Sequence, residues 1–459
     1  MNKIRRSVGI ALLVLALALY FPPNIPATGY TVTELWSDPM PVTDVAVSKD
    51  GNYVVAVNST GLYYFSKNSS ITLWWYYTQY YDTFWSVAIS KDGNYVAVGS
   101  DSIYGYSRLF YFNESSTRTD DQTGKETWTS SYIPGRLDSQ RLVDMSDDGN
   151  YVVAGIWITS VNVTYFADCT TRRSGTEDAT WYNYTGLLFG IRAVDISPDG
   201  RCVAAGGSVS LRGWVAFFNN SDVSSGPRLA SWLALAPVDS PIQDVAVSDD
   251  GYAVAAASPG PGALNYWADS NKLPNDPLNT WNRTIPFLCV DMSSDGDMVV
   301  AGSEIINCVH FWDGARTLSG PDRPENWTSP EEEDIYDVGI SDDGKIIAAV
   351  SPFGVGLGEI YFYTSSGALI DHFTRDPTLN VLSMSGDGST VAVGGGGGGG
   401  GTLYVYGIKP LTPVGGELLI PDKLELMAPY LALAVLVVAT AGILSGTGFR
   451  NIFFHAALT

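Results

Sequence analysis

One phrase recurs eight times along this chain, and it constrains the fold more than any other feature. It places apolar residues at alternate positions and follows them with Ser-x-Asp-Gly. The copies occupy residues 45–51, 87–93, 143–149, 194–200, 245–251, 290–296, 338–344 and 382–388. Their glycines lie 42, 56, 51, 51, 45, 48 and 44 residues apart. A repeat of about 40–50 residues is typical of propellers and solenoids.

Each copy has the pattern of a β-hairpin. Apolar alternation before the phrase predicts a strand, as at Val45 and Val47. Ser and Asp hydrogen-bond to turn backbone, and Gly accepts a positive φ. A second strand, an aromatic third strand and a fourth segment follow in most copies. The fourth segment usually carries a tryptophan, at positions Trp75, Trp128, Trp181, Trp232, Trp281 and Trp327. Four short strands per repeat make one propeller blade.

The eighth copy supplies only three strands before the chain leaves the repeat region. The missing strand is available at residues 31–36, where Leu35-Trp36 matches Leu73-Trp74 ahead of the next copy. An N-terminal strand in this place would close the ring and remove an exposed sheet edge. We therefore predict an all-β, eight-bladed β-propeller over residues 30–407, with seven blades as the alternative.

The two ends of the chain have membrane signals. Lys3, Arg5 and Arg6 precede an apolar run over residues 8–21, which indicates a signal peptide or an N-terminal anchor within residues 1–29. Residues 426–449 carry no charge and are long enough to span a bilayer. Arg450 follows them, so the positive-inside rule places the tail 450–459 in the cytoplasm and the propeller outside. Residues 408–425 form the linker, and the predicted location is the cell membrane, with a single span.

The charge of the chain excludes one class of partner. It carries 48 acidic and 26 basic residues, a net charge of −22, and has no cluster of Lys and Arg. Nucleic-acid binding needs such a cluster, so we expect no nucleic-acid partner.

The hairpin phrase and the aromatic third strand resemble those of WD40-like and quinoprotein-like (PQQ-type) propellers of prokaryotic, in particular archaeal, cell-surface proteins. Residues 120–128, DDQTGKETW, resemble the tryptophan-docking repeat of quinoprotein propellers, in which the Trp packs between blades. The Trp-Asp ending that names the WD40 family occurs once, at Trp312-Asp313. The resemblance implies a fold and gives little information on function.

Few residues suggest catalysis. Members of the quinoprotein family that oxidise alcohols carry adjacent cysteines, and here Cys169, Cys202, Cys289 and Cys308 are all separate. The three histidines, His310, His372 and His455, have no nucleophile or metal-ligand partner at a useful spacing. We therefore expect no enzyme activity, no catalytic residues and no cofactor. A quinoprotein-like, PQQ-dependent oxidoreductase is the alternative.

Acids on the predicted first strands are the candidate ligands of a metal. They are Asp44, Asp144, Asp195, Asp244, Asp291 and Asp337. In a propeller this strand lines the central channel, where carboxylates could hold Ca²⁺ with its about six to eight oxygen ligands. The favoured interpretation is instead that these acids bond to backbone or to channel water, because buried polar groups find partners. Two different offsets from the turn serine also weaken a single-ring arrangement.

The remaining candidates lie on the surface. Tyr80 and Tyr81 fall in a blade-to-blade connection, where they could stack on a sugar or a partner protein. Eight N-x-Ser/Thr sequons are glycosylation candidates, at Asn58, Asn68, Asn113, Asn162, Asn183, Asn219, Asn282 and Asn326. The sequence thus predicts a membrane-anchored extracellular propeller that binds a protein or a glycan or serves as a scaffold.

Overall fold

A computed structural model describes residues 29–411, except 69–74, 80, 103, 138, 157–160, 173–174, 185–188, 210–211, 224, 236–239, 260–262, 275–276, 304–305, 331–333, 354–355 and 398–399. The predicted signal segment and the predicted membrane span lie outside these residues. Among the described residues, no helix has the length and apolar character needed to cross a membrane. Residues 27–410 form one compact unit.

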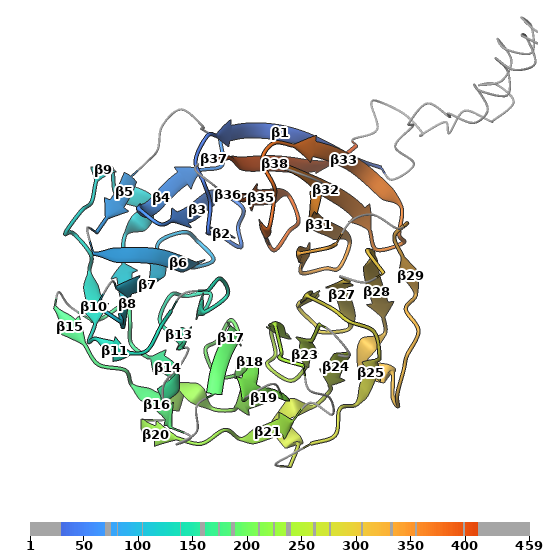
Figure 1. The fold of residues 1–459 in the computed structure, drawn as a ribbon, viewed down its shortest axis with the longest axis horizontal. Helices are drawn as coiled ribbons and strands as arrows, with labels where there is room; N and C mark the ends of the chain where they lie inside the picture. The colour runs from blue at the N-terminus through green and yellow to red at the C-terminus, as the bar shows by residue number, and fades with distance from the viewer. Residues whose placement is uncertain are drawn as a thin grey trace, which may run out of the picture. The chain divides into compact units, whose positions relative to one another are not determined.

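Eight sheets surround a central channel in the order of the chain (Figure 1). Blade 1 contains β2 (Asp44–Val47), β3 (Tyr53–Asn58), β4 (Gly61–Ser66) and β5 (Trp75–Thr78). Blade 2 contains β6 (Asp82–Ile89), β7 (Val96–Ser102), β8 (Tyr106–Phe112) and β10 (Trp128–Ser130), with β11 (Ile133–Pro134) also paired to β8. Blade 3 contains β12 (Val143–Met145), β13 (Val152–Gly155), β14 (Val161–Phe166) and β16 (Trp181–Tyr184). Blade 4 contains β17 (Phe189–Ile196), β18 (Val203–Val209), β19 (Arg212–Phe218) and β21 (Trp232–Leu235).

The second half of the ring follows the same plan. Blade 5 contains β22 (Asp244–Val247), β23 (Val254–Ala257), β24 (Leu264–Trp267) and β25 (Trp281–Arg283). Blade 6 contains β26 (Cys289–Met292), β27 (Met298–Gly302), β28 (Val309–Asp313) and β29 (Trp327–Thr328). Blade 7 contains β30 (Asp337–Ile340), β31 (Ile346–Phe353), β32 (Leu357–Thr364) and β33 (Leu369–Arg375). Blade 8 contains β34 (Val381–Met384), β35 (Thr390–Gly394), β38 (Leu403–Pro410) and β1 (Tyr30–Asp38).

Blade 8 is closed by the N-terminal strand, as predicted. Strand β1 pairs antiparallel with β38, in a register that runs from Tyr30 opposite Pro410 to Asp38 opposite Leu403. Its Trp36 is buried, and Trp36 Nε1 donates to the carbonyl of Lys67 in blade 1 at 2.9 Å. The first strand of the described chain therefore joins the last blade and ties it to the first.

The Ser-x-Asp-Gly phrase forms the turn between the first and second strands of every blade. In blade 1, Ser48 Oγ donates to Asp50 Oδ1 at 2.6 Å and accepts from the Tyr53 N–H at 3.0 Å. Gly51 has φ +71°, a conformation that side chains disfavour. The serine hydroxyl thus donates one hydrogen bond and accepts another within the same turn, which explains why the phrase recurs.

Tryptophans connect neighbouring blades at seven of the eight boundaries in the described chain. Each indole Nε1 donates to a backbone carbonyl of the next blade, from Trp36 to Lys67, Trp75 to Ser115, Trp128 to Cys169, Trp181 to Ser221, Trp232 to Ser270, Trp281 to Ala315 and Trp327 to Ser365. At the remaining boundary, between blades 7 and 8, the rings of Phe373 and Tyr406 lie 5.1 Å apart. The packing role expected for the predicted tryptophans is confirmed.

Short segments add features that the repeat did not predict. Four 3-10 helices follow the third strands of blades 2, 4, 5 and 6, namely η1 (Ser115–Thr117), η2 (Ser221–Val223), η3 (Ser270–Lys272) and η4 (Ala315–Thr317). Strands β9 (Asp120–Asp121), β15 (Thr176–Glu177) and β20 (Gly226–Arg228) pair in parallel with the outer strands of the preceding blades. The run of glycines at residues 394–401 contains a two-stranded hairpin of β36 (Gly396–Gly397) and β37 (Gly400–Gly401).

Candidate functional site: the central channel and the blade 2 tyrosines

The six predicted channel acids all line the channel, and each bonds to backbone N–H groups of two blades. One oxygen accepts from the following residue of its own strand, as in the Val45 N–H to Asp44 Oδ1 bond at 3.0 Å. The other oxygen accepts from the first strand of the next blade, as in the Val87 N–H to Asp44 Oδ2 bond at 3.0 Å. The blade-to-blade donors to Asp144, Asp195, Asp244, Asp291 and Asp337 are Ile196, Val247, Val290, Ile340 and Leu382. The interpretation that these acids bond to backbone is confirmed.

Two serines complete the circle where aspartate is absent. Ser86 Oγ accepts the N–H groups of Leu142 and Val143 at 3.1 Å, which joins blade 2 to blade 3. Ser383 Oγ accepts from the Val47 N–H at 3.0 Å, which joins blade 8 to blade 1. Side-chain acceptors therefore cross all eight boundaries; we call them the channel staples. The two offsets seen in the sequence correspond to two levels along the channel. An acceptor four residues before its turn serine bonds to the N–H that lies three residues before the turn serine of the next blade, as Asp44 does with Val87. An acceptor two residues before its turn serine bonds to the N–H that lies one residue before the next turn serine, as Asp144 does with Ile196.

Burial in the channel raises the pKa values of its carboxyls. The pKa of Asp44 and of Asp291 rises to about 7, and that of Asp244 rises to about 6 although Arg141 opposes the shift. Burial raises the pKa of Asp195 well above its ordinary value, and the charge of Asp144 raises it further. Burial thus makes these carboxyls keep their protons to a higher pH than exposed carboxyls do. In the part of the chain that the structure describes, no group of three or more His, Cys, Asp or Glu residues is arranged to hold a metal ion.

Two cations reach across the channel. Arg141, the residue before Leu142, places Nη1 2.8 Å from Asp244 Oδ2 and also pairs with Asp337, so blade 3 contacts blades 5 and 7. On the side of the hairpin turns, Lys49 Nζ lies 2.9 Å from Asp249, 3.5 Å from Asp342 and 4.0 Å from Asp147. The channel cavity measures about 310 Å³. Arg141 and Lys49 therefore add ion pairs across the ring to the bonds between neighbouring blades.

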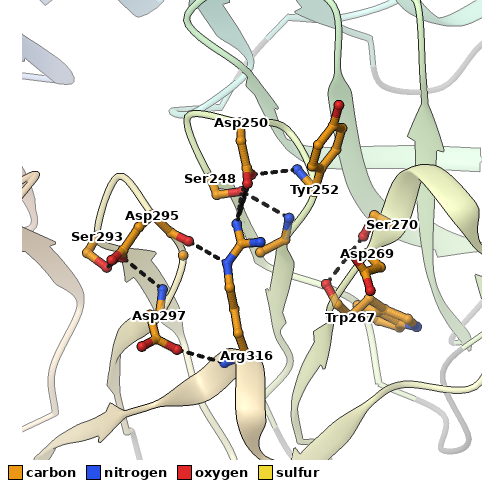
Figure 2. A network of polar contacts seen from close by, with 12 residues as sticks. Ser248, Asp250, Tyr252, Trp267, Asp269, Ser270, Ser293, Asp295, Asp297 and Arg316 are labelled. Atoms are coloured by element: carbon orange, nitrogen blue, oxygen red, sulfur yellow. Dashed lines mark hydrogen bonds and ion pairs between the residues drawn. The ribbon is translucent and has the colours of Figure 1, made fainter.

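A third cation connects two blades outside the channel. Figure 2 shows Arg316 of η4 extended between the turns of blades 5 and 6. Its Nη2 lies 2.8 Å from both oxygens of Asp250, its Nε donates to the carbonyl of Asp295, and its backbone N–H donates to Asp297 Oδ1 at 3.1 Å. This contact is structural, since it satisfies the turn carboxylate of the neighbouring blade.

Four of the six exposed tyrosines among the described residues belong to blade 2. Tyr81 is 47% exposed, and its ring lies 5.7 Å from that of Tyr104, which is 65% exposed. Tyr81 precedes β6 and Tyr104 lies between β7 and β8, so a blade-to-blade connection meets a second-to-third connection, as the strand order predicts. Tyr80, the other candidate, lies outside the described residues. Tyr104 was not a candidate in the sequence, because nothing in its local pattern distinguished it from a packed aromatic.

The sequons fall into two structural groups. Asn68, Asn113, Asn219 and Asn326 lie in third-to-fourth connections, whereas Asn58, Asn162, Asn183 and Asn282 lie within strands. Asn183 is only 5% exposed, and its Nδ2 donates to the Arg228 carbonyl at 2.8 Å. Asn58 is also 5% exposed, and its Oδ1 accepts from the N–H groups of Thr60 and Gly61. Glycan attachment at any of the eight stays a prediction, and burial makes Asn58 and Asn183 poorly accessible.

The four cysteines and the ring of His310 are buried. All four cysteines are free thiols inside the blades. The ring of His310 is 1% exposed and lies 5.1 Å from that of Phe287.

No protein-family model matches this chain, and no curated protein sequence matches it either. The resemblance to WD40-like and quinoprotein-like proteins is therefore supported at the level of an eight-bladed propeller built from repeats, and membership of either family stays a prediction.

Proposed function

We propose that this chain is a non-enzymatic binding or scaffold module, displayed outside the cell by its C-terminal segment. A rigid ring that presents loops on its faces is the usual setting for binding residues. The observation that carries the proposal is the exposed Tyr81–Tyr104 pair, on loops held by a scaffold whose eight blade boundaries are each bonded. Tyrosine provides a large, rigid contact area that loses little conformational entropy on binding.

The charge of the chain supports an extracellular protein or glycan as partner. A net charge of −22 repels nucleic acid and other polyanions. The acids in the channel support a non-enzymatic role, because each is already used as a bond acceptor between blades. The membrane anchor is proposed from residues 426–449, which carry no charge over a length that spans a bilayer.

Capture of surface partners by the full chain tests the proposal. Wild-type protein, the Tyr81→Ala/Tyr104→Ala variant and a Tyr252→Ala control would be compared for retention of proteins and glycans from the surface of the expressing cells. Tyr252 is 40% exposed and follows the turn glycine of blade 5, so it controls for loss of an exposed tyrosine elsewhere. We expect the double variant to lose a partner that the control retains, with unchanged melting temperatures. Equal capture by all three proteins would contradict the assignment of this face.

The alternative function is a quinoprotein-like oxidoreductase, which shares the eight-bladed architecture. Dye reduction with added pyrroloquinoline quinone and a panel of alcohols distinguishes the two. Turnover above that of heat-treated protein would favour the oxidoreductase, and no turnover together with partner capture would favour the binding module.

A further inference from the structure

A cavity of about 290 Å³ lies on the outer rim of the ring, between blades 2 and 3. Its walls come from the chain around β10 and β11 on one side and from β14 and β16 on the other, and β15 brings Glu177 and Asp178 to its edge. The Ser131 N–H donates to the Glu177 carbonyl at 2.9 Å, and Ser131 Oγ donates to Asp178 Oδ1 at 2.5 Å. These bonds between blades hold the two walls in register, so the cavity is built into the fold.

Two tyrosines line this cavity, one from each blade. Tyr132 is 63% exposed, its ring lies 5.7 Å from that of Tyr106, and Tyr182 is half-buried on the opposite wall. Three polar residues line the same space, namely Ser131, Asp178 and Thr164, and the hydroxyl of Thr164 donates to the Ala154 carbonyl. Aromatic faces pack against C–H groups, while carboxylates and hydroxyls accept hydrogen bonds from vicinal O–H groups. This combination suits a ring that has C–H groups on its faces and hydroxyls on its edge.

Charge around the cavity selects against anions. The guanidinium of Arg108 lies over the Tyr132 ring at 5.4 Å and pairs with Asp82, and Arg172 lies 3.5 Å from Glu177. Because these ion pairs neutralise both arginines, a polyanion would meet Asp178 and the net charge of −22. A neutral ligand avoids this penalty and can use the aromatic faces together with the polar groups. The volume is at the bottom of the about 300–1,000 Å³ range of small-molecule sites, which fits a single sugar ring.

We propose that this cavity binds the terminal neutral hexopyranose of a glycan, with the sugar ring against Tyr132 and Tyr182 and its hydroxyls on Asp178 and Ser131. The inference rests on the proposed binding function and names the ligand class for a site separate from the Tyr81–Tyr104 pair.

An array of neutral oligosaccharides that end in glucose, galactose, mannose or N-acetylhexosamine, together with sulfated and sialylated glycans, tests the inference when it is probed with the full chain. We expect binding to at least one of these termini, competed by the matching methyl glycoside. Tyr132→Ala should weaken it by about tenfold or more, the loss typical of a central aromatic contact. Asp178→Asn should also weaken it, since it removes the charge and one acceptor oxygen while the amide oxygen can still accept the Ser131 hydroxyl that holds the walls in register. Tyr252→Ala should bind as wild type does.

Three results would overturn the inference: no binding to any neutral terminus, binding only to sulfated or sialylated glycans, or wild-type binding by both cavity variants. None of these affects partner capture through Tyr81 and Tyr104. If the Tyr132→Ala protein unfolds, as judged by its melting temperature, the Asp178→Asn result decides, and retained binding by that variant overturns the inference.

Discussion

Replacing Arg141 by methionine measures how strongly the channel depends on its central cation. The change keeps much of the aliphatic side chain and removes a guanidinium that pairs with Asp244 at 2.8 Å and with Asp337. Arg141 is 24% exposed and both carboxylates are buried, so their charges would be left without this partner. Loss of one partner from a buried ion pair costs about 3–5 kcal/mol. We expect a loss of free energy of unfolding in that range at pH 8.

The loss should become smaller in mild acid. The pKa of Asp244 is raised from its ordinary 3.8 to about 6, mainly by burial. A carboxyl with a raised folded-state pKa favours folding when protonated, and this contribution is lost as the pH rises through the folded-state value. At pH 5 Asp244 is largely protonated and needs Arg141 less, whereas at pH 8 it is ionised. The difference between wild type and Arg141→Met should therefore grow from pH 5 to pH 8.

Urea unfolding of the full chain, followed by tryptophan fluorescence at the two pH values, provides the measurement. Lys272→Met is the control, because Lys272 pairs with Asp269 at 3.1 Å and the two side chains are 69% and 62% exposed. Such a pair contributes at most about 1 kcal/mol. If the two variants lose equal stability, or if the loss in Arg141→Met is the same at pH 5 and pH 8, the channel is solvated and the reasoning fails.

Four further predictions test the ring, its acids and its topology. Deleting residues 31–36 should lower the calorimetric melting temperature more than Trp36→Ala does, because the deletion also opens blade 8. Trp36→Ala alone should lower the free energy of unfolding by about 3–5 kcal/mol. Equal melting temperatures of the two variants would exclude closure by β1. Trp281→Ala should lower the free energy of unfolding in urea by about 3–5 kcal/mol. Trp281→Phe should lower it by only about 1–2 kcal/mol, because the phenyl ring keeps the stacking and loses the 2.8 Å hydrogen bond to the Ala315 carbonyl. The pKa of about 7 makes Asp291 favour folding only while it is protonated, so the free energy of unfolding of the wild type should fall between pH 5 and pH 8. In Asp291→Asn this fall should be smaller by about 2–3 kcal/mol. A fall of the same size in the variant would show that burial does not raise this pKa. Protease added to intact cells should remove the propeller and spare a tag placed after Thr459, and cleavage of the tag from outside would reverse the predicted topology.

Local patterns in the sequence predict the parts of this fold that local chemistry determines. The Ser-x-Asp-Gly turns, the strand order and the tryptophan positions follow from residues close to each other in the chain. Closure by β1 was also predictable, because the eighth repeat lacks a fourth strand. The tryptophan that corresponds to Trp36 in the ring is Trp75, one residue after the pair that suggested the match. The placement of the channel acids follows from their period-two alternation with core residues on the first strands.

Contacts across the ring were not predictable in the same way. Arg141 pairs with residues 103 and 196 positions away, and Lys49 reaches three carboxylates that lie up to 293 positions away in the chain. Such contacts depend on ring closure, and no local pattern encodes them. Ser86 and Ser383 did leave a signal, since each occupies the position of a channel aspartate in the repeat. The rim cavity depends on β11 and β15, two-residue strands that are too short to have a period.

The channel staples have a consequence for how such a chain can evolve. Every staple takes its N–H from the following blade, and the donors belong to backbone positions that each first strand possesses whatever its side chains are. A blade with its acceptor at either of the two channel levels can therefore be followed by any other blade, because the N–H group that the acceptor needs is always present. Duplication or exchange of whole repeats preserves the bonding of the ring, so unequal recombination can vary the outer loops without a matching change at the axis. A chain whose sixth blade is replaced by a copy of the fifth should still unfold in one cooperative transition, and loss of cooperativity would show that blades are specific to their neighbours.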